Sequence, residues 1–468
     1  MDPADLELSP DAMRAMADQV LERVIDHVAT LAEQGAVGDM PEAEARSREL
    51  HHPIPEEGMD LAEALEPLFE RWIPGTFNSA GPGYLGFVPG GGLFPCALAD
   101  LIADATNRYT GVWNASPCLV QLEANVLDHF RRWMDMPDTT RGLITTGGSM
   151  ATFSAVVSAR HRLLGEHLRD GVLYTSSQAH HCVAKAAHLA GILRDRHRLI
   201  EVDETMRMRV DALEDAIQED RRAGLKPFLV VSAAGTTNTG AVDPLADIGQ
   251  LCRNHDIWHH CDAAYGGFFQ LVDELRPTLA GLGEADSVTL DPHKGLFLPY
   301  GTGALLVREG DALRQAHGAH ASYLPPLADD RYDPAQYGPE LSRPFRGLRV
   351  WLPLVLYGLE RFVAALREKH ELARWCAERL VTDERFTVLE PPPLSLFAFR
   401  FHPHPSSSPE EVDQATRTLL DRVNAERDVF LTGATAAGRF YGRVCVLCFR
   451  TRRAHVAQAI DALHRLAR

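Results

Sequence analysis

The sequence predicts an α/β protein built on a mostly parallel sheet that is covered by helices. Between about residues 83 and 301, short apolar runs alternate with segments of helical periodicity. The runs that read as strands are 142–145, 172–175, 228–232, 257–261 and 287–290, and the helix-like segments include 150–164 and 210–223. Short buried strands separated by helices are typical of parallel sheets with helices on their faces.

Residues 1–82 are expected to form an N-terminal helical arm. The first 35 residues read as one helix, because Ser9-Pro10-Asp11 is a start signal and apolar residues recur at helical spacing up to Leu31. A polar stretch follows to about Gly58, and a second helix is predicted over 61–72. An arm with so little apolar surface does not fold alone, so we expect it to pack on another body such as a second subunit.

Residues 83–350 are expected to form the large domain and residues 351–468 a small α+β domain. The small domain is predicted to contain a long helix to about residue 381, strands 394–401 and 442–449, and helices 409–425 and 454–467. Segment 322–344 combines proline, tyrosine and aspartate without periodicity. An irregular stretch of that length is more often a functional lid than a plain surface connection.

The composition narrows the class of protein. The chain has 468 residues and a formal net charge of −17, which argues against a general binder of nucleic acid or anionic membranes. No apolar stretch approaches the roughly 18–20 residues that span a bilayer. The start, Met1-Asp2-Pro3-Ala4-Asp5, does not resemble a secretory signal. We therefore expect a cytoplasmic protein without a nucleic-acid or membrane partner.

Neither of the two metal-like motifs predicts a metal site. Cys445 and Cys448 form a CxxC, but they lie in an alternating β-like run, where positions three apart point to opposite faces. No second pair completes a four-ligand site, so buried core cysteines are the favoured interpretation. In His259-His260-Cys261-Asp262, strand alternation likewise keeps the side chains from converging on one ion.

Residues whose side chains or backbone could bind a ligand or react stand at the ends of successive predicted strands. Thr145–Met150 joins a strand to a helix through small residues, an arrangement that can bind an anion at the positive end of the helix. Gln178–His181 opens a helix, and Gly235–Gly240 is a polar loop. Asp262 and Lys294 each follow an apolar strand. Taken singly, each has a plainer explanation as a turn, a helix cap or a surface charge.

Together these residues fit one cofactor. Open α/β sheets bind ligands at the carboxyl ends of their strands, and the five groups there supply an anion cradle, a ring-stacking histidine, a polar loop, a carboxylate and an amine. This set suits pyridoxal 5′-phosphate (PLP), which combines a phosphate, an aldehyde that condenses with lysine, and a ring nitrogen that pairs with a carboxylate.

The sequence resembles the group II PLP-dependent amino-acid decarboxylases, with the aromatic-amino-acid enzymes as the nearest branch. The likeness covers most of the chain, and order and spacing agree. Its motifs are Trp113-Asn114-Ala115-Ser116-Pro117, Gly147-Gly148-Ser149, Ser177-Gln178-Ala179-His180, Gly235-Thr236-Thr237, Asp262-Ala263-Ala264-Tyr265, Asp291-Pro292-His293-Lys294 and Arg343–Trp351. The resemblance implies the aspartate-aminotransferase-like fold (PLP fold type I), PLP as cofactor, an amino-acid substrate, and a homodimer with its sites at the interface.

The resemblance also implies roles for individual residues. Lys294 matches the lysine bound covalently to the cofactor, Asp262 the partner of the ring nitrogen, and His180 the ring-stacking histidine. The other matches are Ala264 against the ring face, Gly148, Ser149 and Asp291 near the phosphate, and Thr237 and His293 near the cofactor. Tyr323 resembles the mobile-loop tyrosine that delivers a proton.

The chain departs from the family around the substrate. Met150 replaces a frequent glutamate, Gly86–Gly92 is unusually rich in glycine, and Gly111 replaces a phenylalanine. The residues predicted to line the substrate pocket are Tyr84, Phe87, Gly90 and Tyr109. An aromatic L-amino acid is the expected substrate, and an acidic one such as glutamate would need a cation in the pocket.

Other activities remain open at this stage. An oxidative decarboxylase that forms an aldehyde shares the scaffold, although such enzymes often replace the tyrosine found at position 323. A transaminase shares the cofactor but matches the motifs less well. A non-enzymatic PLP-binding regulator is disfavoured by the complete lysine, aspartate, histidine and tyrosine set.

Overall fold

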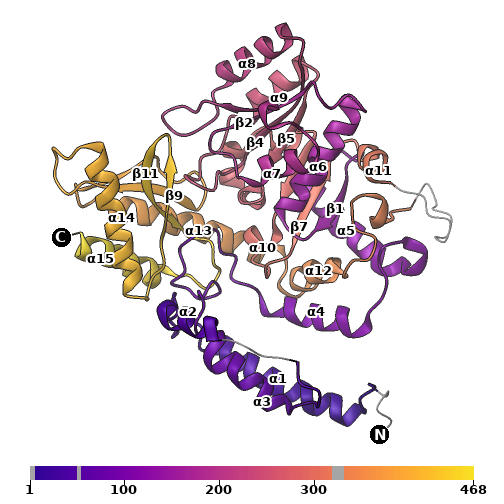
Figure 1. The fold of residues 1–468 in the computed structure, drawn as a ribbon, viewed down its shortest axis with the longest axis vertical. Helices are drawn as coiled ribbons and strands as arrows, with labels where there is room; N and C mark the ends of the chain where they lie inside the picture. The colour runs from indigo at the N-terminus through magenta and orange to yellow at the C-terminus, as the bar shows by residue number, and fades with distance from the viewer. Residues whose placement is uncertain (1–5, 50–53, 319–330, 468) are drawn as a thin grey trace.

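A large sheet of seven strands forms the centre of the molecule (Figure 1). The computed structural model describes residues 6–49, 54–318 and 331–467. The strands of this sheet are β1 (Arg141–Thr145), β2 (Gly171–Ser176), β3 (His197–Ile200), β4 (Lys226–Ala233), β5 (Trp258–Asp262), β6 (Ser287–Leu290) and β7 (Gly303–Val307). Their spatial order is β1-β7-β6-β5-β4-β2-β3. Only β7 runs antiparallel to its neighbours, so the predicted mostly parallel sheet is confirmed.

Helices cover both faces of this sheet because the strands are apolar on both sides. In β2, Leu173 packs with helices α6 (Gly148–Leu164), α7 (Cys182–Leu189) and α11 (Asp311–His317) on one face. Its neighbours Val172 and Tyr174 pack on the other face with α8 (Val210–Arg222) and α9 (Leu245–Asn254). The alternation follows from the two-residue period of a strand. Helix α5 (Pro117–Trp133) packs against β1.

A four-stranded antiparallel sheet forms the smaller C-terminal part, in the order β10-β11-β9-β8. Its strands are β8 (Phe386–Val388), β9 (Leu396–Phe401), β10 (Thr432–Ala436) and β11 (Arg439–Cys445), and its helices are α13 (Leu359–Leu380), α14 (Pro409–Ala425) and α15 (Arg453–Leu466). The buried side chains of these elements form a core of their own.

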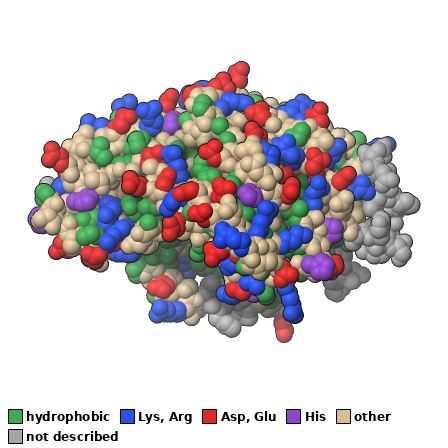
Figure 2. Space-filling view, turned by 90° about the horizontal axis from the view of Figure 1, so that it is seen from above, with side chains coloured by type: hydrophobic (Ala, Val, Ile, Leu, Met, Phe, Trp, Pro, Cys, Tyr) green, Lys and Arg blue, Asp and Glu red, His purple; other side chains and the backbone are tan. Residues whose placement is uncertain are grey.

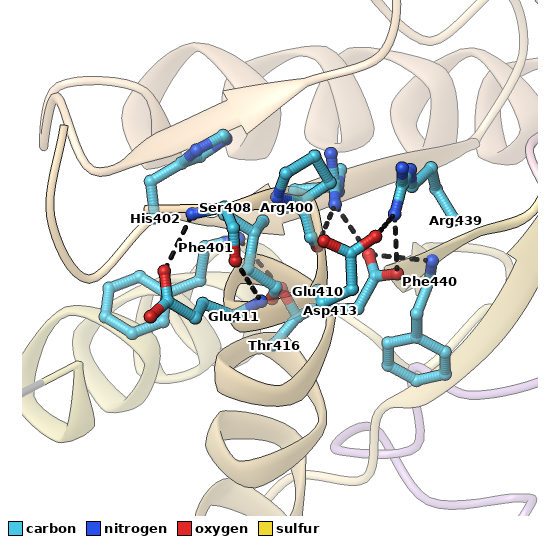
Figure 3. A network of polar contacts seen from close by, with 12 residues as sticks. Arg400, Phe401, His402, Ser408, Glu410, Glu411, Asp413, Thr416, Arg439 and Phe440 are labelled. Atoms are coloured by element: carbon cyan, nitrogen blue, oxygen red, sulfur yellow. Dashed lines mark hydrogen bonds and ion pairs between the residues drawn. The ribbon is translucent and has the colours of Figure 1, made fainter. Parts of the chain in front are cut away.

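Polar contacts fix the start of α14 on this sheet (Figure 3). Ser408 caps the helix by accepting a hydrogen bond from Glu411 N, and the Glu411 carboxylate accepts one from Ser408 N. Asp413 pairs with Arg400 of β9 at 2.5 Å and accepts a hydrogen bond from the backbone N–H of Phe440 at 3.1 Å. One helical turn thus ties two strands together.

The N-terminal arm lies beside the rest of the chain in Figure 1. Helix α1 (Pro10–Ala29) begins at Ser9, whose side chain accepts a hydrogen bond from Ala12 N, and the helix contains no buried residue. Helices α2 (Met40–Glu49) and α3 (Leu61–Pro67) follow, and α3 continues as a π-helical turn, Leu68–Trp72. The exposed apolar residues of α1 agree with the expectation that the arm needs a partner surface.

Several sequence predictions need correction. The first helix is α1 alone and ends at Ala29, while α2 occupies part of the polar stretch, for which no helix was predicted. The long helix expected up to residue 381 is two helices, α12 (Arg346–Tyr357) and α13, which are separated by Gly358 with φ +72°. Only glycine adopts that conformation without strain, and it ends the first helix.

Four strands were missed: β3, β7, β8 and β10. The predicted limits of the three domains are not tested by these elements, although the limit after residue 350 falls inside α12.

Charges of both signs are interspersed over the face shown in Figure 2. Among the helices that the structure describes, none has the length and apolar character needed to cross a bilayer.

Candidate active site

A cavity of about 250 Å³ opens at the carboxyl ends of the parallel strands. Its lining comes from the turns after β1, β2, β4, β5 and β6, which are far apart in the sequence. The lining residues are Thr146–Met150, His180, Cys182, Gly235, Thr237, Asp262, Ala264, Tyr265, Asp291, His293 and Lys294. Every residue that we predicted to bind the cofactor is in this set.

The start of α6 forms an anion cradle on one side of the cavity. Gly147 has φ +151°, a conformation that favours glycine, and α6 begins at the next residue. The first N–H groups of a helix have no partner within it, and they carry the positive end of the helix dipole. A Cβ at Gly148 would lie 2.9 Å from Asp291 Oδ2 and 3.3 Å from Ala264 Cβ. The cradle therefore has the donors for a phosphate and tolerates no larger residue at position 148.

Lys294 reaches the cavity from a short helix, α10 (Pro292–Gly295), directly after β6. Its Nζ lies 2.8 Å from Oδ2 of Asp291. Burial by itself lowers the pKa of Lys294, but the Asp291 carboxylate outweighs it, so the pKa is raised above its ordinary value. The lysine is an ammonium in this arrangement.

Asp262 ends β5 and lies in the same cavity. Its Oδ1 accepts a hydrogen bond from Ala264 N at 3.2 Å. Burial raises the pKa of this carboxyl, while the positive charge of Lys294 opposes the shift. A bound cation such as a protonated ring nitrogen would favour the ionised carboxylate further.

Two histidines flank these charges, and both are held neutral. Burial, followed by the charges of His181 and Lys294, lowers the pKa of His180 to about 4. Burial also lowers the pKa of His293, whose Nδ1–H donates to the carbonyl of Thr302 at 2.7 Å. A neutral, half-buried His180 has the apolar ring faces that a stacking partner of an aromatic cofactor needs.

The loop after β4 is fixed to the turn after β2. Asn238 Nδ2 donates to Gln178 Oε1 at 3.1 Å, and Gly240 N donates to Thr236 O at 2.9 Å. These bonds hold Thr237 at the rim of the cavity and position the chain that leads to His180. The sequence predicted that both segments face the ligand, and the contact between them comes from the fold.

The predicted substrate residues lie outside the cavity lining of the single chain. Tyr84 is buried and stacks on Phe430 with ring centroids 5.0 Å apart, and Phe87 is 52% exposed in the same aromatic cluster. Gly90 packs its backbone on the turn of Lys294, because a Cβ there would lie 2.1 Å from His293 O. Tyr109 donates a hydrogen bond to Leu341 O at 3.4 Å. Their role in substrate binding stays a prediction.

Tyr323, the predicted proton donor, lies outside the described residues, which omit 319–330.

Two lining residues, Cys182 and Tyr265, had no predicted role. Burial raises the pKa of the Cys182 thiol to about 12, which makes it unreactive. The hydroxyl of Tyr265 accepts a hydrogen bond from Ser395 N at 2.8 Å and so links the cavity to the C-terminal part. Tyr265 ends the motif that begins with Asp262, and its place in this motif was the one feature of the sequence that could have indicated its position in the cavity.

Comparison with known proteins agrees with this geometry. A family model described as "Pyridoxal-dependent decarboxylase conserved domain" matches residues 45–402. The chain is 31% identical to an aromatic-L-amino-acid decarboxylase of Bacillus atrophaeus, over 99% of this chain and 97% of the relative. It is 30% identical to tyrosine decarboxylase 2 of Narcissus pseudonarcissus, over 86% and 84% respectively.

A solved structure is similar over the whole chain. The crystal structure of Oryza sativa TDC with PLP and tryptamine superposes with a TM-score of 0.94 at 25% identity, covering 99% of both chains.

Proposed function

Because the chain belongs to the pyridoxal-dependent decarboxylase family and is a PLP-dependent amino-acid decarboxylase, we propose that it converts aromatic L-amino acids to amines and carbon dioxide. The observation that carries the proposal is the meeting of Lys294, Asp262 and His180 in one cavity beside an anion cradle. The choice of aromatic substrates is supported by the Bacillus atrophaeus and Narcissus relatives, whose names include an aromatic amino acid or tyrosine.

The residues around the cavity fit PLP. The start of α6 offers backbone N–H groups and the positive end of the helix dipole to the phosphate, and Gly148 leaves room for it. Ala264 would lie against the face of the cofactor ring, and Lys294 would supply the amine for its aldehyde; both residues line the cavity. When bound, PLP supplies an electron sink for the electrons left at Cα as carbon dioxide departs.

Asp262 keeps a proton on the cofactor's ring nitrogen. The buried carboxylate is stabilised as an anion by an adjacent cation, and by the same interaction it raises the pKa of that cation. A neutral amide at this position would remove the charge and leave the shape. His180 lines the cavity, and with its pKa lowered to about 4 by burial it would present a neutral ring for stacking on the cofactor.

Protonation at Cα is assigned to Tyr323, which belongs to the segment outside the described residues. Its phenol is the proposed proton donor, and His180, which lines the cavity, is the second candidate. A donor at Cα directs the reaction to the amine and away from an oxidised aldehyde product.

A homodimer is proposed from an exposed apolar face. Helix α4 (Phe94–Thr106) packs on α12, and together they expose large apolar side chains. These are Leu101, Ile102, Trp351, Val355 and Leu356, which are 37–59% exposed. A contiguous apolar surface on neighbouring helices is typical of a subunit interface.

The proposal is tested by carbon dioxide release from the purified enzyme with added PLP. The panel contains tryptophan, tyrosine, phenylalanine, DOPA, glutamate and cysteine sulfinate, and amine, aldehyde and peroxide are quantified in each reaction. We expect amine and carbon dioxide in equal amounts from at least one aromatic substrate, and none with Lys294→Ala. Turnover of the acidic substrates alone, or aldehyde with peroxide as the main product, would reject the proposed activity.

A further inference from the structure

Asp291 places its carboxylate beside the first turn of α6, which forms the anion cradle. Oδ2 lies 2.8 Å from Lys294 Nζ and 3.7 Å from His293 Nε2. The same oxygen is 2.9 Å from the position that a Cβ on Gly148 would take, so the carboxylate lies against the first turn of α6. The family resemblance implies for this residue only a place near the phosphate.

The other oxygen of this carboxylate has no partner. Asp291 is 2% exposed, and Oδ1 makes no hydrogen bond to any residue that the structure describes. A buried polar atom without a hydrogen bond destabilises the state that contains it. The free-energy cost of burying this carboxylate with one oxygen unbonded must be offset by positive charge nearby. The two positive groups next to it are the start of α6 and the ammonium of Lys294.

Those two features are also the ones that would attract a phosphate. An anion gains from the dipole and free N–H groups at a helix start, and from a neighbouring ammonium. Two anions that share one such site in a low-dielectric interior repel each other. A phosphate in the cradle and an ionised Asp291 at its present position are therefore alternatives.

We propose that Asp291 is an internal competitor for the cradle, which pairs with Lys294 in the cofactor-free enzyme and must leave the start of α6 when the phosphate of PLP binds. The inference rests on the proposed function, because it assigns the cradle to the phosphate. It makes Asp291 a residue that weakens cofactor binding, in contrast to the phosphate-side residues Gly148 and Ser149.

The ion pair with Lys294 opposes loading in a second way. Condensation with an aldehyde needs the neutral amine, and pairing with Asp291 favours the ammonium. This second effect acts on any aldehyde, whereas competition for the cradle acts only on a ligand that carries a phosphate. Pyridoxal, which lacks the phosphate, separates the two.

The test is a binding titration of the cofactor-free enzyme, with native protein compared with Asp291→Asn. PLP and pyridoxal are each titrated and followed by absorbance, without any amino-acid substrate. We expect Asp291→Asn to bind PLP at least tenfold more tightly than native enzyme, and the gain for PLP to exceed the gain for pyridoxal at least tenfold. Unchanged or weaker PLP binding, or equal gains for the two aldehydes, would overturn the proposal.

Two further variants test whether a tighter binding of PLP comes from the lost net charge or from the changed shape of the side chain. Asp11→Asn makes the same change in net charge on the exposed face of α1 and should leave PLP affinity at the native value. Asp291→Ser removes the carboxylate with a different shape and should show the same preference for PLP over pyridoxal. If Asp291→Asn does not fold, the serine variant decides the question with the same outcomes.

Inorganic phosphate gives an independent readout. Phosphate stabilises a protein to which it binds, so it should raise the thermal midpoint of cofactor-free Asp291→Asn more than that of the native protein. Equal rises would count against competition at the cradle. Since neither readout uses substrate, a failure here leaves the proposed decarboxylation to be judged by its own assay.

Discussion

The buried ion pair between Glu123 and Arg343 gives a prediction that can be worked out in detail. Glu123 lies on α5 and Arg343 precedes α12, and both side chains are 1% exposed with Oε1 and Nη1 2.8 Å apart. Arg343 also donates from Nη2 to the carbonyl of Ile144 at 3.1 Å, in the strand that leads to the cradle. The change to make is Glu123→Gln, which keeps the shape and removes the charge.

Glu123→Gln should be strongly destabilising. Removing one member of a buried pair leaves the other charge uncompensated and costs about 3–5 kcal/mol, whereas an exposed pair is worth about 0–1 kcal/mol. At about 1.4 kcal/mol for each factor of ten, the ratio of folded to unfolded protein should fall at least a hundredfold. Because Arg343 holds Ile144 O, the loosened arginine should also weaken PLP binding several-fold.

The assay is urea denaturation of the cofactor-free protein, followed by the fluorescence of its six tryptophans. A double-mutant cycle with Arg343→Met measures the coupling, since the double variant removes both charges. We expect the double variant to be more stable than the sum of the two single changes by at least 1 kcal/mol. Asp11→Asn, which breaks an exposed pair with Arg14 on α1, serves as the matched control and should leave the midpoint unchanged.

A loss below 1 kcal/mol in Glu123→Gln would refute the reasoning, because it would mean that the remaining charge finds water or another partner. Additive single changes would refute it as well, since they would show that the two charges do not interact.

Three other predictions concern the site and its surroundings. Lys294→Ala should bind PLP without a covalent link, so borohydride treatment followed by mass spectrometry should detect no added cofactor, and a labelled protein would assign the link to another lysine. Tyr323→Phe should slow amine formation and, with dioxygen as the oxidant, divert part of the product to aldehyde and peroxide, and an unaltered amine yield would remove Tyr323 from the mechanism. Burial, with the charge of His259, lowers the pKa of His260 to about 3, so only the unfolded chain takes up its proton as pH falls below 6.5. The free energy of unfolding of the native protein should therefore fall by about 2 kcal/mol between pH 6.5 and 5 because of this group, and His260→Gln should not show this fall in urea denaturation. An identical pH dependence in the two proteins would contradict the conclusion that His260 stays neutral in the folded protein.

Some elements could be predicted from the sequence because their signals are local. The strand Ser287–Leu290 and the helix Pro409–Ala425 have the predicted limits. The helix starts at a serine cap with a proline next to it and a glutamate three residues after the cap, so its first turn is determined by neighbouring residues. Runs of apolar residues that end at a small or charged residue mark buried strands in the same local way.

Other elements depended on contacts between distant segments. β7 pairs antiparallel with β1 and β6. Its apolar residues would suit any buried strand, so they do not indicate the direction or the partners of the strand. β10 (Thr432–Ala436) has glycine and alanine, which have low strand propensity, at three of its five positions, and it forms because β11 pairs with it in a hairpin. The break between α12 and α13 rests on the conformation of Gly358, and an isolated glycine inside a helical pattern is also tolerated without a break.

The sequence by itself determined which residues stand at the strand ends. Order along the chain and the two-residue period of strands are enough to place Lys294, Asp262 and His180 at one edge of a parallel sheet. Only the tertiary structure decided which of their charged groups pair with one another. The pairing of Lys294 with Asp291, the unsatisfied Oδ1 and the contact with the start of α6 depend on burial and on atoms brought together from different strands. Side-chain electrostatics follow distance and solvent exclusion in three dimensions, and neither quantity is written in the order of residues.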